Sequence, residues 1–115
     1  MRFNDTKISN FEWVEDQILS FDLQPTNELL RIADGIRKEK GYTDMVTDDD
    51  TDVWYNYYLD VDVVKETVTM WFSCNNGEKD DYANYTIDLS EEEIKMLIWK
   101  AFRQFAKEMD ECVEF

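Results

Sequence analysis

Hydrophobic residues recur at intervals of three and four in the first part of the chain, which is the spacing of an amphipathic helix. Four large apolar residues fall on one face in this way: Phe11, Val14, Ile18 and Phe21. Ser9 and Glu12 have the spacing of a capping box, in which each side chain binds the other residue's backbone N–H. The pattern therefore predicts a first helix over residues 10–21.

Helical spacing returns in two later stretches. After Pro25 it predicts a second helix over residues 26–40. Cations gather in its last turn, where they suit the helix dipole, and Gly41 follows as a typical residue after a helix end. Near the end of the chain, Ser90 and Glu93 form a second capping box. The apolar residues after it keep helical spacing, which predicts a long last helix running to the end of the chain.

Between residues 52 and 89 the apolar period changes to two, the period of a half-buried strand. Over 53–61 an apolar set alternates with a mixed set that contains Trp54, Asn56, Tyr58 and Asp60. Two further strands are predicted over 67–74 and 82–89, and the dipeptide Asn76-Gly77 marks the turn between them. Short connections make all three strands antiparallel neighbours.

These elements predict one α+β domain over residues 1–115. Its expected order is two N-terminal helices, a three-stranded antiparallel meander and a long C-terminal helix. The helices are expected to cover one face of the sheet and to leave the other partly open.

The net charge of the chain indicates its function more clearly than any sequence motif does. The chain carries 27 Asp and Glu against 12 Lys and Arg, a net charge of −15, with 43% hydrophobic residues. This balance predicts a folded domain that attracts basic partners and does not itself bind nucleic acid or an anionic membrane. The chain shows neither an apolar run of about 18 residues nor the apolar stretch of a signal peptide, so we expect a cytoplasmic protein.

Catalytic and metal-binding patterns are weak. The chain has no His, and its two cysteines, Cys74 and Cys112, are expected to be reduced thiols. Asp48, Asp50 and Asp52 occupy the first, third and fifth positions of an EF-hand loop, but the required Gly and Glu are replaced by Val53 and Leu59. We therefore expect no metal, no cofactor, no small-molecule ligand and no enzymatic activity.

Residues 42–62 contain seven aspartates and no Lys or Arg, beside several large aromatic side chains. On an extended strand, Asp60 and Asp62 would point to one face about 6.7 Å apart, a spacing of the same order as that of neighbouring phosphates. Carboxylates in rows around aromatic rings suit a protein groove that is built for phosphates and bases. The predicted partner-binding residues are Asp44, Asp48, Asp49, Asp50, Asp52, Trp54, Tyr58, Asp60 and Asp62.

In size, charge and order of elements, the chain resembles the small acidic inhibitors, encoded by phages, that mimic nucleic acid. Anti-CRISPR proteins that act on type II effectors belong to this class. The resemblance implies a target in the positively charged channel or the PAM-reading site of the nuclease, and inhibition by occlusion. Two alternatives are an immunity protein that neutralises a basic nuclease toxin, whose physics is similar, and an enzyme or metal-dependent regulator.

Overall fold

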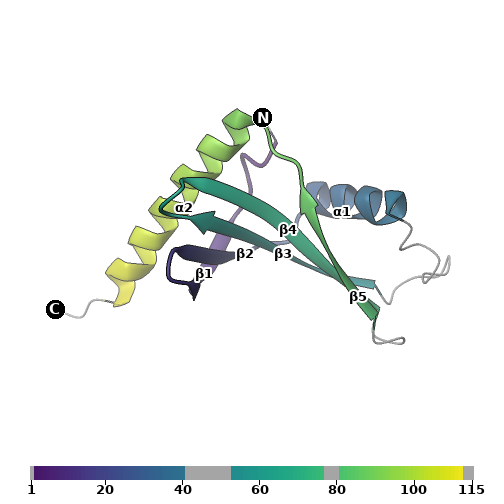
Figure 1. Cartoon of the computed structure of the whole chain (residues 1–115), viewed down its shortest axis with the longest axis horizontal. Helices are drawn as coiled ribbons and strands as arrows, with labels where there is room; N and C mark the ends of the chain where they lie inside the picture. Colours follow the sequence, from purple (N-terminus) through teal and green to yellow (C-terminus); the bar gives the residue numbers. More distant parts are fainter. Residues whose placement is uncertain (1, 41–52, 77–80, 113–115) are drawn as a thin grey trace.

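The computed structural model describes residues 2–40, 53–76 and 81–112 of the chain. Within them, two helices pack on a five-stranded antiparallel sheet whose strands follow one another in sequence order (Figure 1). The elements run in the order β1 (Ile8–Glu15), β2 (Ile18–Leu23), α1 (Asn27–Glu39), β3 (Val53–Asp62), β4 (Thr67–Asn76), β5 (Asp81–Ile87) and α2 (Glu91–Cys112). The α+β class is confirmed, with an element order that differs from the prediction.

The predicted first helix over 10–21 is wrong, because this segment forms the hairpin of β1 and β2. In β2 the buried residues Leu19, Phe21 and Leu23 alternate with Ser20 and Asp22, as a half-buried strand requires. All six residues of β2 also pair with β3. Pairing with a neighbouring strand therefore overrides the helical spacing of the apolar residues.

The second helix, the three strands and the start of the last helix agree closely with the structure, whereas the predicted roles of Gly41 and Gly77 and the predicted end of the last helix at 113–115 lie outside the described residues. Thr26 caps α1 by accepting a hydrogen bond from the backbone N–H of Leu29. At the start of α2, the Ser90 hydroxyl accepts from the Glu93 N–H at 3.2 Å, and the Glu93 carboxylate accepts from the Ser90 N–H at 2.9 Å. The capping box that was read from the sequence is thus formed. The three predicted strands correspond to β3, β4 and β5.

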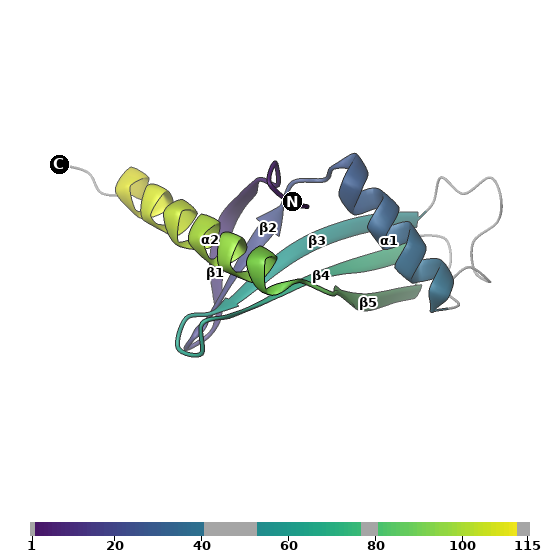
Figure 2. The ribbon, with the colours of Figure 1, turned by 90° about the horizontal axis from the view of Figure 1, so that it is seen from above.

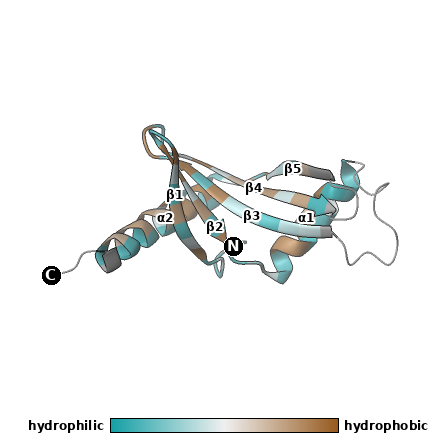
Figure 3. Ribbon diagram, turned by 90° about the horizontal axis from the view of Figure 1, so that it is seen from below, coloured by the Kyte–Doolittle hydropathy of each residue, from teal (hydrophilic) through white to brown (hydrophobic). Residues whose placement is uncertain are grey.

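Both helices lie on the same side of the sheet (Figure 2). The core packs Leu29 and Ala33 of α1, and Leu97 and Ala101 of α2, against alternate residues of the strands. Figure 3 shows this alternation as changes of hydropathy along the strands. The opposite face of the sheet carries no helix and faces the viewer in Figure 1. No helix in the described part of the chain is long and apolar enough to cross a membrane.

A turn before β1 ties the two helices together. Phe3 is buried, and its N–H donates to the Glu28 carboxylate on α1 at 3.1 Å. The Lys100 amine on α2 donates to the carbonyl oxygens of Phe3, Asn4 and Thr6. Arg2 forms two hydrogen bonds with the Glu93 carboxylate, at 3.0 and 3.1 Å. This turn therefore helps to hold α1 and α2 on the same face.

The variant Glu93→Gln tests how much the contact between Arg2 and Glu93 stabilises the fold. The hydrogen bond from Arg2 holds the pKa of the buried Glu93 carboxyl below its usual value. Its stabilisation is therefore present above the unfolded-state pKa of about 4.5 and is lost as the pH falls through the folded-state value. The variant should lower the free energy of unfolding at pH 7 by about 1–3 kcal/mol, and the difference from wild type should shrink below about pH 4.

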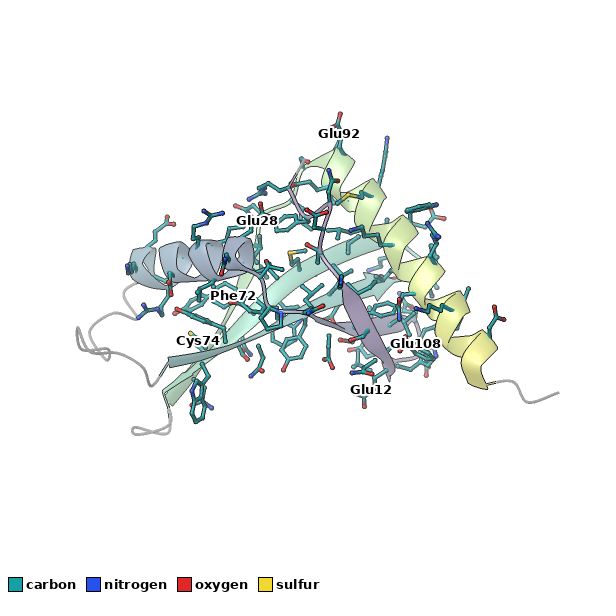
Figure 4. All side chains as sticks on the ribbon, turned by 180° about the vertical axis from the view of Figure 1, so that it is seen from behind. Glu12, Glu28, Phe72, Cys74, Glu92 and Glu108 are labelled. Carbon is teal, nitrogen blue, oxygen red and sulfur yellow. The ribbon has the colours of Figure 1, made fainter. Side chains whose placement is uncertain are left out.

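Urea denaturation of both proteins at pH 7 and at acid pH measures this difference. Glu92→Gln is the matched control, because the exposed Glu92 side chain projects from the first turn of α2 (Figure 4). Equal stability of the two variants at pH 7 would show that the contacts of Glu93 contribute nothing.

Candidate partner-binding surface

The side chains on the face of the sheet opposite the helices form a continuous surface, which we call the open face. Pairing of the strands arranges its residues in rows, because paired residues of antiparallel strands point to the same side. Three rows can be followed: Ser20–Asp60–Thr69, Asp22–Tyr58–Trp71–Thr86, and Asn56–Ser73–Asn84. The longest row crosses four strands, from β2 to β5.

The centre of the open face is an aromatic pair. The rings of Tyr58 on β3 and Trp71 on β4 stack with their centroids 4.4 Å apart and an angle of 28° between their planes. Both side chains are half-buried. Large rings that are already ordered suit the centre of an interface, because little side-chain entropy is lost when a partner covers them.

Asp60 connects this pair to the neighbouring strand. One oxygen of its carboxylate accepts from the Ser20 hydroxyl at 2.6 Å, and the other accepts from the Trp71 indole N–H at 3.0 Å. The carboxylate therefore fixes the orientation of the Trp71 ring, and it remains partly exposed itself. A negative charge held in place beside two stacked rings is the main chemical feature of the open face.

The open face has no cation of its own. None of the residues of β1 to β5 is Lys or Arg, although these strands contain six carboxylates. The basic residues of the described segments lie in the segment before β1, in the helices and in the connections between elements. Trp54, near the beginning of β3, adds a third ring, which is 62% exposed and also lines a pocket with Asn27 and Leu30 of α1. The surface is thus aromatic and polar, with negative charge at Asp22 and Asp60.

The structure brings together only some of the residues that were predicted to bind a partner. Trp54, Tyr58 and Asp60 share the open face. Asp44, Asp48, Asp49, Asp50 and Asp52 lie outside the described residues. The prediction left out Trp71, Asp22 and Ser20, which complete the site. Trp71 could have been included from the sequence, because it alternates with Met70 and Phe72 and must face away from the core.

Asp62 lies at the end of β3, and its contacts are those of a turn residue. It is 8% exposed and accepts hydrogen bonds from the Gln17 side chain at 2.7 Å and from the N–H groups of Val64 and Lys65 at 3.0 and 2.8 Å. The Lys65 N–H is the main cause that lowers the pKa of its carboxyl. We therefore assign Asp62 to the β3–β4 turn and leave it out of the candidate surface.

Asp62→Ala should consequently destabilise the fold. The change leaves two backbone N–H groups of the turn and the Gln17 amide without their acceptor, which is costly where water does not replace it. Asp22→Ala, an exposed change in β2, is the control and should have little effect on stability. Thermal unfolding of the two variants checks this expectation, and a melting temperature of Asp62→Ala equal to that of the control would contradict it.

On the opposite face of the sheet, a polar network links α1 to β3. The Tyr55 hydroxyl accepts from the Arg37 guanidinium at 2.7 Å and donates to the Asp34 carboxylate, which lies 3.6 Å from Arg37 Nη2. Burial raises the pKa of Tyr55, and it raises that of the neighbouring Tyr57 to about 12. Both phenols therefore stay neutral at physiological pH. The hydrogen bonds of Tyr55 to Arg37 and Asp34 hold α1 on the sheet.

Cys74 lies near this network as a buried free thiol (Figure 4). Burial raises its pKa, and its Sγ donates weakly to the carbonyl oxygen of Ala83. A buried neutral thiol is a poor nucleophile, which fits a packing role. In the described segments, no group of three or more Cys, Asp or Glu residues is placed to hold a metal ion. The EF-hand-like aspartates lie outside these segments.

No protein-family model, curated protein or solved structure that was compared with the chain matches it. The function of the chain must therefore be inferred from the chemistry of its surface.

Proposed function

We propose that this protein is a non-enzymatic inhibitor that uses its open face to occupy the nucleic-acid-binding groove of a basic protein. The observation that carries the proposal is the arrangement around Asp60, where a carboxylate holds the stacked Tyr58 and Trp71 rings on a sheet without cations. Grooves that bind nucleic acid present Lys and Arg for phosphates and often aromatic or planar groups for bases. The open face offers the complementary chemistry in both respects.

Association would combine two effects. The net charge of −15 steers the protein toward a positive groove and raises the rate of encounter. Once the surfaces meet, the Tyr58–Trp71 pair forms the dehydrated centre, and Asp60 and Asp22 face Lys or Arg of the groove. The aspartates of residues 42–52 contribute to the net negative charge that attracts the groove. Inhibition follows from occupation of the groove and requires no chemical step.

The target that best fits this description is a type II CRISPR effector nuclease, which would make the protein an anti-CRISPR protein acting in the bacterial cytoplasm. Such a nuclease reads its PAM with arginines and holds the guide–target duplex in a positively charged channel. Both are sites where carboxylates can replace phosphates. The likeness in size and charge to phage-encoded inhibitors supports this choice of target.

Purified components test the proposal directly. The protein is added to a panel of guide-loaded type II effectors, and binding of target DNA is followed by a mobility-shift assay. At least one effector should lose DNA binding at an equimolar ratio, and excess DNA should restore it. Failure to bind any effector in the panel would remove this target. Inhibition of a basic nuclease toxin in a parallel panel would instead support the immunity-protein alternative.

Replacing Asp48, Asp49, Asp50 and Asp52 by Asn tests the contribution of the acidic segment. Charges at the margin of an interface act mainly on the association rate and on its salt dependence. Each exposed ion pair contributes about 0.2–1 kcal/mol, so the variant should bind the target about tenfold more weakly at low salt. The difference should fade as salt is raised. Affinities measured across a salt series check this, and parallel curves would exclude the segment from the contact.

A further inference from the structure

A second candidate site lies on the other side of the molecule, beside α2. A groove of about 840 Å³ separates the middle of this helix from the segment that leads into β1. Four cations line it, Lys7, Lys100, Arg103 and Lys107, together with Trp99. No Asp or Glu is among its lining residues. In a chain with more than twice as many acids as bases, such a gathering of positive charge is unexpected.

The fold accounts for only one of these cations. Lys100 binds three backbone carbonyl groups and so has a structural task. In the described segments, neither Lys7, Arg103 nor Lys107 forms an ion pair with a carboxylate. The dipole of α2 does not explain them either, because its last turn contains no basic residue. Three cations are therefore available to a ligand.

The lining also indicates the chemistry of that ligand. Thr6, Ser9, Gln24 and Gln104 add neutral hydrogen-bond donors to the cations. Arg103 lies with its guanidinium carbon 4.5 Å from the centre of the Trp99 ring, which is 57% exposed. Guanidinium and ammonium groups bind phosphate oxygens strongly, and an exposed indole offers an apolar surface to a planar ring.

The net charge of the whole protein limits the size of the ligand that this groove can bind. A long polyanion would have to lie along a surface with a net charge of −15 and would be repelled. A compact anion that stays inside the groove meets the lining cations directly. Asp110 lies beside Arg103 and Lys107 in the adjoining hollow, and salt screens the carboxylates that lie beyond a Debye length of about 8 Å. We propose that this groove binds a compact phosphorylated molecule such as a nucleotide. Its phosphates would lie against Lys7, Arg103 and Lys107, and its ring against Trp99.

A small-molecule site was not expected from the sequence, and this one is independent of the proposed inhibitory function. The groove faces α2, whereas the Tyr58–Trp71 pair lies on the opposite side of the sheet. A failure of either proposal therefore leaves the other unaffected.

Calorimetric titration of the full chain with sodium tripolyphosphate and with ATP, both without metal, tests the inference. Both probes should bind at a single saturable site and raise the melting temperature. The double variant R103Q/K107Q keeps helix-forming residues of similar length and should weaken both probes by about tenfold or more for each charged contact that is lost. Trp99→Leu should weaken ATP and leave tripolyphosphate unchanged.

The matched control is R31Q/K95Q, which removes one Arg and one Lys from exposed helical positions outside the groove and gives the same net charge. It should bind both probes almost as wild type does. An equal loss in the two double variants would show that only net charge matters and would overturn the site. Absence of saturable binding by the wild-type protein at millimolar probe concentrations would also overturn it.

Discussion

Replacing Thr86 by Arg should weaken binding to the basic target by at least about 100-fold, because juxtaposed like charges in an interface cost several kcal/mol. Thr86 is exposed on β5 and ends the row that contains Tyr58 and Trp71. A cation at this position would face the Lys and Arg side chains of the occupied groove. The free protein should fold normally, since an exposed side chain on the open face has room for the longer chain and Arg lowers the net negative charge.

The control for this experiment is Ala106→Arg on α2. It adds the same charge at an exposed position on the helical side. If the open face is the contact surface, this variant should bind the target as wild type does, apart from a small general effect of net charge. Calorimetry or surface plasmon resonance with the purified target compares the two variants. Equal affinities, or a loss in Ala106→Arg alone, would place the contact elsewhere.

Trp71→Ala should weaken target binding by about 30- to 1,000-fold, corresponding to about 2–4 kcal/mol, as expected for an aromatic residue at the centre of an interface. The change removes the ring that stacks on Tyr58 and leaves the Asp60 carboxylate without its indole partner. Because the lost contribution is mainly apolar, the ratio of affinities should be nearly independent of salt. Trp71→Phe keeps a ring without the N–H donor and should lie between wild type and Trp71→Ala.

Trp99→Ala is the matched control, since it removes an equally large and partly exposed ring from α2. It should leave target binding unchanged. Thermal unfolding of each variant separates a binding defect from a folding defect. A Trp71→Ala protein that is folded and binds with full affinity would show that the aromatic pair serves only the stability of the sheet.

Physical reasons explain which parts of the fold were predictable from the sequence. In β3 the strict alternation from Tyr55 to Val61 gave the correct strand and the correct buried face. In β1 the period of two is interrupted by a bulge, where the register shifts between Ser9 and Glu12 and Asn10 adopts φ of 54°. With this interruption the apolar residues have the spacing of a helix, and Ser9 and Glu12 have the spacing of a capping box. The segment was therefore predicted to be helical. The strand that fixes the hairpin in the sheet is β3, which pairs with β2, and the paired residues Ser20 and Asp60 are 40 positions apart in sequence.

The candidate site was only partly predictable for a related reason. The alternation of β3 identified Trp54, Tyr58 and Asp60 as residues that face away from the core. Their chemistry depends on neighbours from other strands, because Trp71 and Ser20 bind Asp60 only when β2, β3 and β4 pair in the observed register. Strand register depends on tertiary structure and cannot be predicted from one strand alone. Because the β1–β2 hairpin was predicted as a helix, β2 was not recognised as a neighbour of β3. The sequence pattern therefore predicted the residues of one strand and missed the row that they belong to.

In the proposed complex, the open face lies inside the nucleic-acid-binding groove of the target. Site-specific photo-crosslinking tests it most directly, with a benzophenone side chain introduced at position 86 on the open face or at position 106 on α2. Crosslinked peptides of the target are then identified by mass spectrometry, with and without nucleic acid. We expect that position 86 crosslinks to peptides of the groove, that nucleic acid abolishes these crosslinks, and that position 106 gives none. Crosslinks from position 106 alone, or crosslinks from position 86 that persist while nucleic acid is bound, would contradict it.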